Sequence, residues 1–518
     1  MLNLSVLLEN SASKYPNKPA FTFMDTSFSF AQVNAVANQV ANGLEQAGIK
    51  PGDKVALSCF NVPYFPIIFN GILKIGATVV PLSVLLKEDE IEYHLDNSDA
   101  KAYFCFIGTE DLPMGKMGYA GFSKVKKCEH FFMIMPKLEM PSPIEGTKTF
   151  GSLLVNKSTL FDAVATKETD TAVIVYTSGT TGKPKGAELS HSNLVQNTIL
   201  STDLYNCSSE DKLLIVLPLF HIFALTVLML SALYRASTSI LLPRFDAKTV
   251  LDLLEKHKIS VFAGVPTMYW GLNSYLESND YDISNIKTNL RTCLSGGASL
   301  PVAVLNNFEK EFDVLILEGF GMSEGSPVVT FNQLDVGRKP GSVGTPVWGV
   351  QVKLVDSDGN EVTQGEKGEL LYKGHNVMKG YYNNTEATAK AIKDGWLYSG
   401  DIAIKDEDGF YFIVDRTKDM IIRGGLNIYP REVESVMMKH PAVSMAAVIG
   451  VPHEQMGEEV KAFIVLKAGA TANEEELMQF TKENIAAYKY PRIVEITKAL
   501  PTSATGKILK KELRNYGN

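Results

Sequence analysis

The chain of 518 residues contains few cysteines and lacks the common metal-binding motifs. Its five cysteines, Cys59, Cys105, Cys128, Cys207 and Cys293, are scattered and form no CxxC pair. An odd, scattered set in a chain of this length argues against a disulfide framework and indicates reduced thiols in a cytoplasmic setting. The eight histidines include no HExxH motif, so a structural or hydrolytic zinc site is not expected.

Basic residues are also fewer than acidic ones. Lys and Arg number 50 against 58 Asp and Glu, which gives a net charge of −8, and no run rich in Lys or Arg stands out. This balance argues against nucleic acid as a main partner, although it leaves room for local basic pockets. The first residues lack a basic lead and a cleavage site, and the final four, 515–518, are no retention or peroxisomal signal. We therefore expect a cytoplasmic protein.

One stretch, residues 213–233, is long and free of Asp, Glu, Lys and Arg. Its length fits a membrane-spanning helix. However, Pro218 and His221 interrupt it, and a histidine is costly in the middle of a bilayer. The pattern therefore favours a buried strand and then a buried helix over 222–234, with residues 218–221 in the loop between them. No transmembrane span is expected, while peripheral membrane contact stays open.

The pattern along the chain predicts an α/β multidomain protein. Residues 1–170 and 171–339 alternate helical and strand patterns, which predicts two doubly wound α/β subdomains. Residues 340–415 carry short apolar strands separated by turn signals, which predicts a small β-barrel-like subdomain that completes an N-terminal domain, 1–415. Mixed patterns return over 416–518, a small, mobile α+β C-terminal domain. Without a long Gly/Ser linker, we expect a short hinge near Lys418.

The stretch Thr177–Gly186 (TSGTTGKPKG) combines hydroxyls, glycines and lysines after the apolar run 172–176. Glycine lets backbone N–H groups approach an anion, while hydroxyl groups add donors and lysines add charge. The spacing is not that of the Walker loop. The sequence predicts a strand, a polyphosphate-binding turn and then a helix that begins near Ser190 or His191. The alternative is a polar, mobile surface loop.

Four further clusters carry groups that nucleotide chemistry would use. In the stretch 317–324, Phe320 could stack on a purine and Glu324 could hold Mg²⁺. Asp401 could accept both hydrogens of a ribose diol. The remaining two are the charged turn 415–419 and the late segment 501–507, which ends at Lys507. Taken singly, each has a structural alternative: a turn carboxylate or a solvated charge.

Taken together, the clusters resemble the adenylate-forming superfamily of acyl-CoA synthetases, peptide-synthetase adenylation domains and luciferases. The resemblance covers nearly the whole chain, with the motifs in family order. The closest likeness is to bacterial long-chain fatty-acid–CoA ligases, through the stretches 317–327, 338–344 and 376–382. Phe320 stands where tyrosine is commoner, and Ser399 stands where threonine is usual; neither change threatens the chemistry.

The resemblance implies roles for individual residues. Lys507, Glu324 and His221 would be catalytic, Lys418 would be the hinge, and Thr177 and Glu324 would bind Mg²⁺. The implied ATP- and AMP-binding residues are Thr177, Ser178, Gly179, Thr180, Thr181, Gly182, Lys185, Gly297, Ala298, Glu318, Gly319, Phe320, Gly321, Ser323, Asp401, Arg416 and Lys507. The implied acyl-binding residues are Phe220, His221, Val265 and Gly321, and the implied CoA-binding residues are Gly424 and Gly425.

The implied activity is that of an ATP-dependent acid–thiol ligase. It would convert a medium- or long-chain fatty acid to its acyl-CoA through an acyl-adenylate, with ATP, Mg²⁺ and CoA, as a monomer or homodimer. The stretches 222–233 and 261–270 lack Lys and Arg, which disfavours a dicarboxylate substrate. Three alternatives stay open: an aryl-acid CoA ligase, an enzyme that loads a carrier protein, and a nucleotide-sensing or scaffold protein that has kept the fold.

Overall fold

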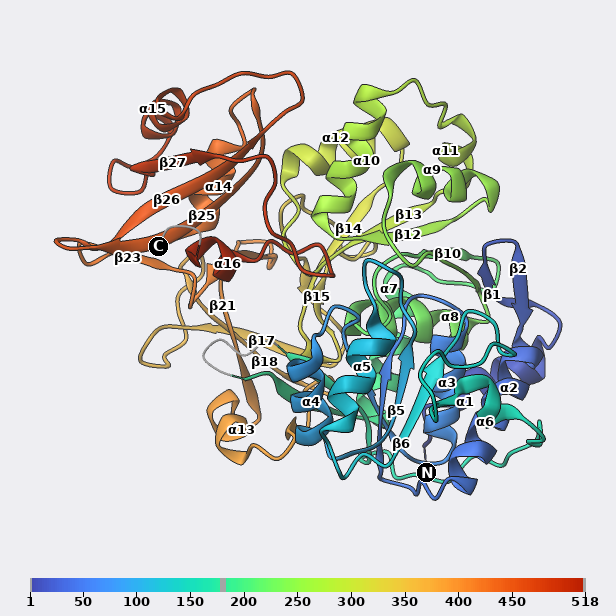
Figure 1. Cartoon of the computed structure of the whole chain (residues 1–518). Helices are drawn as coiled ribbons and strands as arrows, with labels where there is room; N and C mark the ends of the chain where they lie inside the picture. The colour runs from blue at the N-terminus through green and yellow to red at the C-terminus, as the bar shows by residue number, and fades with distance from the viewer. Residues whose placement is uncertain (1, 178–182, 516–518) are drawn as a thin grey trace. The chain divides into compact units, whose positions relative to one another are not determined.

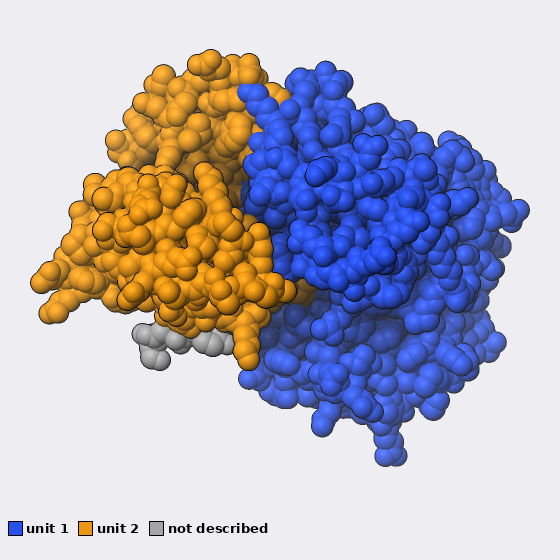
Figure 2. All heavy atoms as spheres, turned by 90° about the horizontal axis from the view of Figure 1, so that it is seen from above, with its two compact units in different colours: residues 1–340, 346–351, 373–397 blue, residues 341–345, 352–372, 398–518 orange. Residues whose placement is uncertain are grey.

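A computed structural model describes residues 2–177 and 183–515 of the chain, which falls into two compact units. Figure 1 shows the elements in chain order, and Figure 2 colours the units separately. Unit 1 consists of residues 1–340, 346–351 and 373–397, and unit 2 of residues 341–345, 352–372 and 398–518. The chain therefore passes between the units several times.

The first sheet of unit 1 has a parallel centre. Its strands stand in the order β16-β15-β14-β13-β12-β10-β11-β1-β2, in which the edge strand β16 is Thr345–Pro346. Their bounds are β15 Val328–Phe331, β14 Ile316–Gly321, β13 Thr292–Ser295, β12 Val261–Gly264, β10 Lys212–Ile215, β11 Thr238–Leu241, β1 Pro19–Phe23 and β2 Thr26–Ser29. All residues of β12 and β13 are buried, as expected for parallel strands covered on both faces.

The second sheet of unit 1 has the strand order β19-β9-β8-β4-β3-β5-β6-β7. The bounds are β19 Gly380–Tyr381, β9 Lys185–Ser190, β8 Thr171–Thr177, β4 Thr78–Pro81, β3 Lys54–Ser58, β5 Ala100–Phe106, β6 His130–Ile134 and β7 Lys148–Thr149. Strands β8 and β9 are antiparallel, with Thr177 opposite Lys185. The predicted order of strand, turn and helix is therefore wrong in one respect, because a second strand comes before the helix.

Helices cover both sheets of unit 1 (Figure 1). They are α1 Val6–Lys14, α2 Phe30–Gln46, α3 Tyr64–Lys74, α4 Glu88–Asn97, α5 Met114–Ser123, α6 Phe150–Leu154, α7 His191–Leu204, α8 Ser231–Arg235, α9 Ala247–Lys256, α10 Pro266–Ser278, α11 Ser284–Asn289, α12 Val302–Phe312 and α13 Thr385–Ala391. Helix α7 begins where the sequence predicts, because the Ser190 side chain accepts a hydrogen bond from the backbone N–H of Asn193.

The uncharged stretch 213–233 forms a buried strand and then a helical segment, as predicted. The segment is not an ordinary α-helix, however. Residues Phe223–Leu230 form a π-helix, η1, and only Ser231–Arg235 continue as the α-helix α8. Among the described residues, no helix is both long and apolar enough to cross a bilayer.

Unit 2 contains two sheets. In the first, β17 (Val350–Val355), β18 (Gly368–Gly374) and β21 (Trp396–Lys405) stand in that order, and β20 (Ile392–Lys393) and β22 (Tyr411–Arg416) both pair with β21. Parts of β17, β18 and β21 lie within unit 2. The second has the order β24-β23-β26-β25, with β27 beside β26. Its bounds are β23 Ile421–Arg423, β24 Leu426–Ile428, β25 Val443–His453, β26 Gly457–Leu466 and β27 Ile493–Ile496.

Three helices accompany the second sheet of unit 2: α14 (Pro430–Met437), α15 (Glu474–Asn484) and α16 (Lys510–Asn515). Helices α14 and α16 contact β25, and α15 contacts β27. The predicted fold class is confirmed by these mixed α/β sheets and by the solved structures described below. The predicted domain bounds, with a division at 415–416, stay a prediction. All five cysteines are buried free thiols.

Candidate active site

Several predicted ligand-binding residues of unit 1 follow the carboxyl ends of neighbouring strands. Strands β10, β12, β13 and β14 are parallel neighbours. Phe220 and His221 lie in the loop after β10, Val265 follows β12, residues 297–298 follow β13, and Gly319–Gly321 end β14. Because parallel strands end at the same edge of a sheet, the fold brings these four segments together. Open α/β sheets bind ligands at this edge.

Two glycines at the end of β14 have no room for a side chain. A Cβ atom at Gly321 would lie 2.2 Å from the carbonyl oxygen of Pro327, and one at Gly319 would lie 2.4 Å from Cδ2 of Phe331. The strand end can therefore run close to its neighbour β15 only with glycine at these positions. Phe320, between them, is only partly buried.

The neighbouring turn after β13 faces an apolar ring. A Cβ atom at Gly296 would lie 3.3 Å from Cε1 of Phe223, and one at Gly297 would lie 3.6 Å from Cγ1 of Val265. Gly297 also has a φ of +79°, which favours glycine. The backbone N–H of Phe223 donates to Nδ1 of His221, at 3.4 Å. Phe223 begins η1, so the π-helix presents its first residue to this strand edge.

Two buried carboxylates flank this region. Glu318 is 4% exposed, and its Oε1 accepts a hydrogen bond from the backbone N–H of Leu300 at 3.2 Å. Glu324 is 6% exposed and lies in the short 3₁₀ turn η2 (Ser323–Gly325). Its Oε1 accepts a hydrogen bond from the hydroxyl of Tyr381 at 2.8 Å. The carboxylate of Glu324 is thus held from outside its own turn.

The residues predicted to bind Mg²⁺ have suitable chemistry. Thr177 ends β8 and Glu324 lies in η2, which contacts both β8 and β9. A hydroxyl and a carboxylate are hard oxygen donors, as Mg²⁺ requires. Among the described residues, no group of three or more His, Cys, Asp or Glu could form an all-protein metal cage. One carboxylate with substrate phosphates is the arrangement typical of Mg²⁺ in nucleotide enzymes.

The predicted phosphate loop is only partly described. Ser178, Gly179, Thr180, Thr181 and Gly182 lie outside the described residues. The lysines after them are both near aromatic rings. The ammonium of Lys185 lies 4.0 Å from the ring centroid of Tyr381, and that of Lys183 lies 5.0 Å from the ring centroid of Tyr93. Such cation–π contacts stabilise the position of a lysine head group.

Unit 2 brings together four residues that the sequence analysis singled out. Asp401 and Arg416 are opposite each other on β21 and β22, and Nε of Arg416 donates to Oδ1 of Asp401 at 2.9 Å. Asp401 is 5% exposed. Its backbone N–H donates to Oγ of Ser399, at 3.1 Å. The buried carboxylate is thus held by Arg416, and the backbone of Asp401 is held by Ser399.

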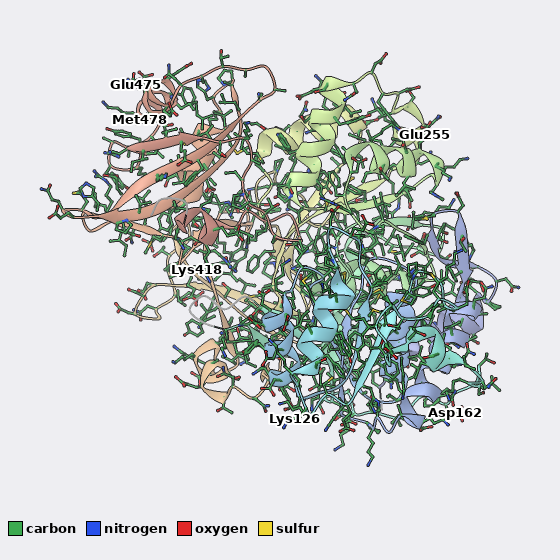
Figure 3. The ribbon with its side chains drawn as sticks, in the orientation of Figure 1. Lys126, Asp162, Glu255, Lys418, Glu475 and Met478 are labelled. Atoms are coloured by element: carbon green, nitrogen blue, oxygen red, sulfur yellow. The ribbon has the colours of Figure 1, made fainter. Side chains whose placement is uncertain are left out.

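Lys507 and Lys418 both interact electrostatically with Asp401 and Arg416. Loss of hydration, followed by the positive charge of Arg416, lowers the pKa of Lys507 to about 8, and Asp401 opposes the shift. The same two causes lower the pKa of Lys418, which is labelled in Figure 3. Lys418 lies in the turn between β22 and β23. The four residues therefore form one charged cluster inside unit 2.

Gly424 and Gly425 form the turn of the β23–β24 hairpin, in which Arg423 is opposite Leu426. Both glycines have positive φ, +56° and +80°. A Cβ atom at Gly424 would lie 2.6 Å from Cε of Met456. The two glycines therefore lie in a hairpin turn, while their role in binding CoA stays a prediction.

Sequence reasoning did not assign a role to Tyr381 or to Phe223. Tyr381 belongs to the stretch 376–382, which supported the family likeness without showing what its side chain contacts. Phe223 is the only aromatic residue of the apolar run 222–233, but the sequence does not show what its ring contacts. Only the pairing of β19 with β9 and the start of η1 show where these rings lie.

Comparison with known proteins shows the family to which the chain belongs. The sequence model of the AMP-binding enzyme family matches residues 8–382, and that of the AMP-binding enzyme C-terminal domain matches residues 432–507. The chain therefore belongs to the AMP-binding enzymes, and the predicted membership of the adenylate-forming superfamily is confirmed.

Individual relatives span nearly the whole chain. A Bacillus subtilis protein named long-chain-fatty-acid–CoA ligase is 37% identical, over 98% of this chain and 94% of its own length. A feruloyl-CoA synthase of an Amycolatopsis species is 35% identical, over 96% of both chains. The crystal structure of the anthranilate CoA ligase AuaEII with anthranoyl-AMP has a TM-score of 0.91, with 31% identity and 99% and 97% coverage of the two chains.

Proposed function

We infer that this protein is an AMP-forming fatty-acid–CoA ligase acting on medium- or long-chain acids. One observation carries the proposal. Strands β10, β12, β13 and β14 end at one edge of the sheet, and the segments that follow them lie there. They bring His221, an apolar wall formed by Phe223 and Val265, and closely packed glycine turns to that edge. At such an edge a nucleotide would lie against the glycine turns, and an acyl chain would lie beside the apolar side chains.

The first half-reaction would join two anions. The carboxylate of the acid attacks the α-phosphorus of ATP, the acyl-adenylate forms, and pyrophosphate leaves. Preorganised positive charge is the main requirement for such a step. When bound between Glu324 and Thr177, Mg²⁺ would offset the charge of the phosphates. Lys185 and Lys507 would supply the remaining positive charge from the protein, while Asp401 would hold the ribose.

In the second half-reaction the thiol of CoA attacks the acyl carbonyl and AMP leaves. In this step no carboxylate approaches a phosphate, so positive charge from Lys507 is needed in the first step alone. The Gly424-Gly425 hairpin would serve the second step, and the turn at Lys418 would permit the exchange. Conformational steps of this kind commonly separate half-reactions.

The apolar wall supports an aliphatic substrate. Phe223 and Val265 line the strand edge, and the buried residues of η1 behind Phe223 carry no charge. No cation is therefore provided there for the second carboxylate of a dicarboxylic acid. The name of the Bacillus subtilis relative points in the same direction.

An aryl-acid CoA ligase is the second candidate. A feruloyl-CoA synthase and an anthranilate CoA ligase are about as similar to this chain, and an aromatic acid would also stack well on Phe223.

A panel of acids tests the proposal. Purified protein with ATP, Mg²⁺ and CoA is offered saturated C8–C16 acids, benzoates and cinnamates, and pyrophosphate and AMP release are measured. The proposal requires the highest kcat/KM with a C8–C16 acid. A preference for benzoates or cinnamates would favour the second candidate. Pyrophosphate exchange with every acid but no acyl-CoA would point to a carrier-protein acceptor, and no exchange with any acid would favour a nucleotide sensor.

A further inference from the structure

We propose that Tyr381 is a positioning residue that fixes the carboxylate of Glu324 through its hydroxyl and thereby sets the affinity of the site for the divalent cation. The inference rests on the proposed function, because that function makes Glu324 a metal ligand. It adds a residue of the 376–382 stretch whose side chain no sequence motif assigns to the reaction. Glu324, Tyr381 and Lys185 all belong to unit 1.

Tyr381 lies in the short strand β19, and the segment around it is hydrogen-bonded to two other elements. In β19, Gly380 is opposite Glu188 and Tyr381 is opposite Ala187, so β19 extends the sheet beyond β9. On the other side, the backbone N–H of Met378 donates to the carbonyl oxygen of Glu324 at 2.9 Å. The segment 378–381 is thus bonded both to the strand that leaves the phosphate loop and to the turn that carries Glu324.

The side chain of Tyr381 contacts the same two elements, the turn that carries Glu324 and the strand β9. Its hydroxyl donates to Oε1 of Glu324 at 2.8 Å, and both residues are buried, at 8% and 6% exposure. The face of its ring lies 4.0 Å from the ammonium of Lys185. One tyrosine therefore contacts both the carboxylate expected to hold the cation and the lysine expected to meet the phosphates.

The tyrosine can act only as the donor in this pair. An ionised carboxylate has no hydrogen to donate, so the hydroxyl of Tyr381 supplies the hydrogen of this bond. The hydrogen bond occupies one oxygen of Glu324 and fixes the orientation of the carboxylate. Groups that orient a metal ligand in this way typically change metal affinity by roughly 10- to 100-fold when they are removed.

The neighbouring residue provides a matched control. The hydroxyl of Tyr382 donates to Oδ2 of Asp99, also at 2.8 Å. Tyr381→Phe and Tyr382→Phe therefore each remove one tyrosine–carboxylate hydrogen bond of the same length and keep the ring. Only the first of these bonds ends on a residue assigned to the cation.

The test measures cation affinity directly. Mn²⁺, which takes the same oxygen ligands as Mg²⁺, is titrated by electron paramagnetic resonance into the full-length protein with α,β-methylene-ATP, which cannot release pyrophosphate. Tyr381→Phe is expected to weaken Mn²⁺ binding by about 10-fold or more, while Tyr382→Phe stays near the wild type. Thermal unfolding of each variant shows whether it is folded.

A double-mutant cycle separates positioning from a merely structural effect. If the hydroxyl acts through Glu324, adding Tyr381→Phe to Glu324→Gln should change Mn²⁺ affinity by less than about twofold. Tyr381→Phe that binds Mn²⁺ as tightly as Tyr382→Phe, or that weakens it equally in the Glu324→Gln background, would overturn the inference. If Glu324→Gln itself leaves Mn²⁺ affinity unchanged, the metal assignment in the proposed function fails instead. Absence of pyrophosphate exchange by the wild type would reject the proposed function as a whole.

Discussion

At the scale of single residues, the proposed chemistry makes its clearest prediction for Lys507. Lys507→Ala should slow ATP–pyrophosphate exchange by about 100- to 1000-fold, since removing one preorganised electrostatic contact costs about 2.7–4 kcal/mol in the barrier. Formation of acyl-CoA from supplied acyl-AMP should stay within a few-fold of the wild type. Both rates are measured on the same preparation. Equal loss in both half-reactions would contradict the role given to Lys507.

The pKa of Lys507 predicts a pH dependence. Because the pKa lies at about 8, the ammonium is mostly protonated at pH 7 and loses its charge as the pH rises through 8. The kcat/KM of pyrophosphate exchange, which reports on the free enzyme, should therefore fall between pH 7 and 9. Lys507→Arg carries a guanidinium that stays protonated across this pH range, so any residual exchange should lose this alkaline decline. The same decline in both proteins would show that another group titrates.

The residues that could be predicted from sequence are those whose function depends on local chemistry. Asp401 and Arg416 could be singled out as charged groups in short motifs, and their pairing across β21 and β22 then follows from the sheet. Tyr381 could not be assigned, because its contact with Glu324 joins residues 57 positions apart. A tyrosine in the sequence looks the same whether its hydroxyl meets solvent or a buried carboxylate.

At the scale of elements, period and capping signals predicted the strand before the phosphate loop, the start of α7 and the buried strand within 213–233, and the exceptions have physical causes. The strand that follows the phosphate loop, β9, was missed because its partly buried polar residues Lys185 and Glu188 interrupt the apolar pattern of a short strand between β19 and β8. The segment 222–234 was predicted as α-helix, but hydrophobicity does not distinguish an α-helix from a π-helix. In η1 every residue is apolar except Thr226.

The attachment of α1 to α3 allows a test of stability. Lys74 in α3 is 1% exposed and forms an ion pair with Glu9 in α1, which is about one-third exposed. Glu9→Ala would leave a buried ammonium without its partner. We expect a loss of about 2 kcal/mol in the free energy of unfolding, less than for a fully buried pair because water screens Glu9.

The matched variant for this pair is Lys74→Met, which replaces the buried charge with an apolar chain of similar length. Its loss should be smaller than that of Glu9→Ala, because no unpaired charge remains in the interior. Urea unfolding of the three proteins measures the difference. A larger loss for Lys74→Met would mean that the lysine contributes mainly through its packing.

At the scale of the whole molecule, the sequence predicted alternating α/β subdomains followed by a β subdomain and a C-terminal α+β domain. The sheets of both units confirm the fold class. The exact grouping of residues could not be read from the chain, because segments 346–351 and 373–397 return to unit 1 after the chain has entered unit 2. Such returns depend on which sheets the strands join, and no local signal records them.

The proposed exchange between half-reactions predicts a distinctive effect of proline at the turn between β22 and β23. Proline fixes φ near −65° and removes the backbone N–H, so Lys418→Pro would restrict rotation at this position. If the turn must change conformation between the two steps, the ratio of pyrophosphate exchange to thioester formation from supplied acyl-AMP should change by about 10-fold or more.

The control for this experiment is Lys418→Ala, which removes the ammonium but leaves the backbone free. Its ratio of the two rates should stay within about threefold of the wild type. If Lys418→Pro slows both steps equally, or changes neither, position 418 is not where the conformational change takes place. If Lys418→Ala shifts the ratio as strongly as proline does, the charge of the lysine matters instead, acting within the cluster it forms with Arg416, Asp401 and Lys507.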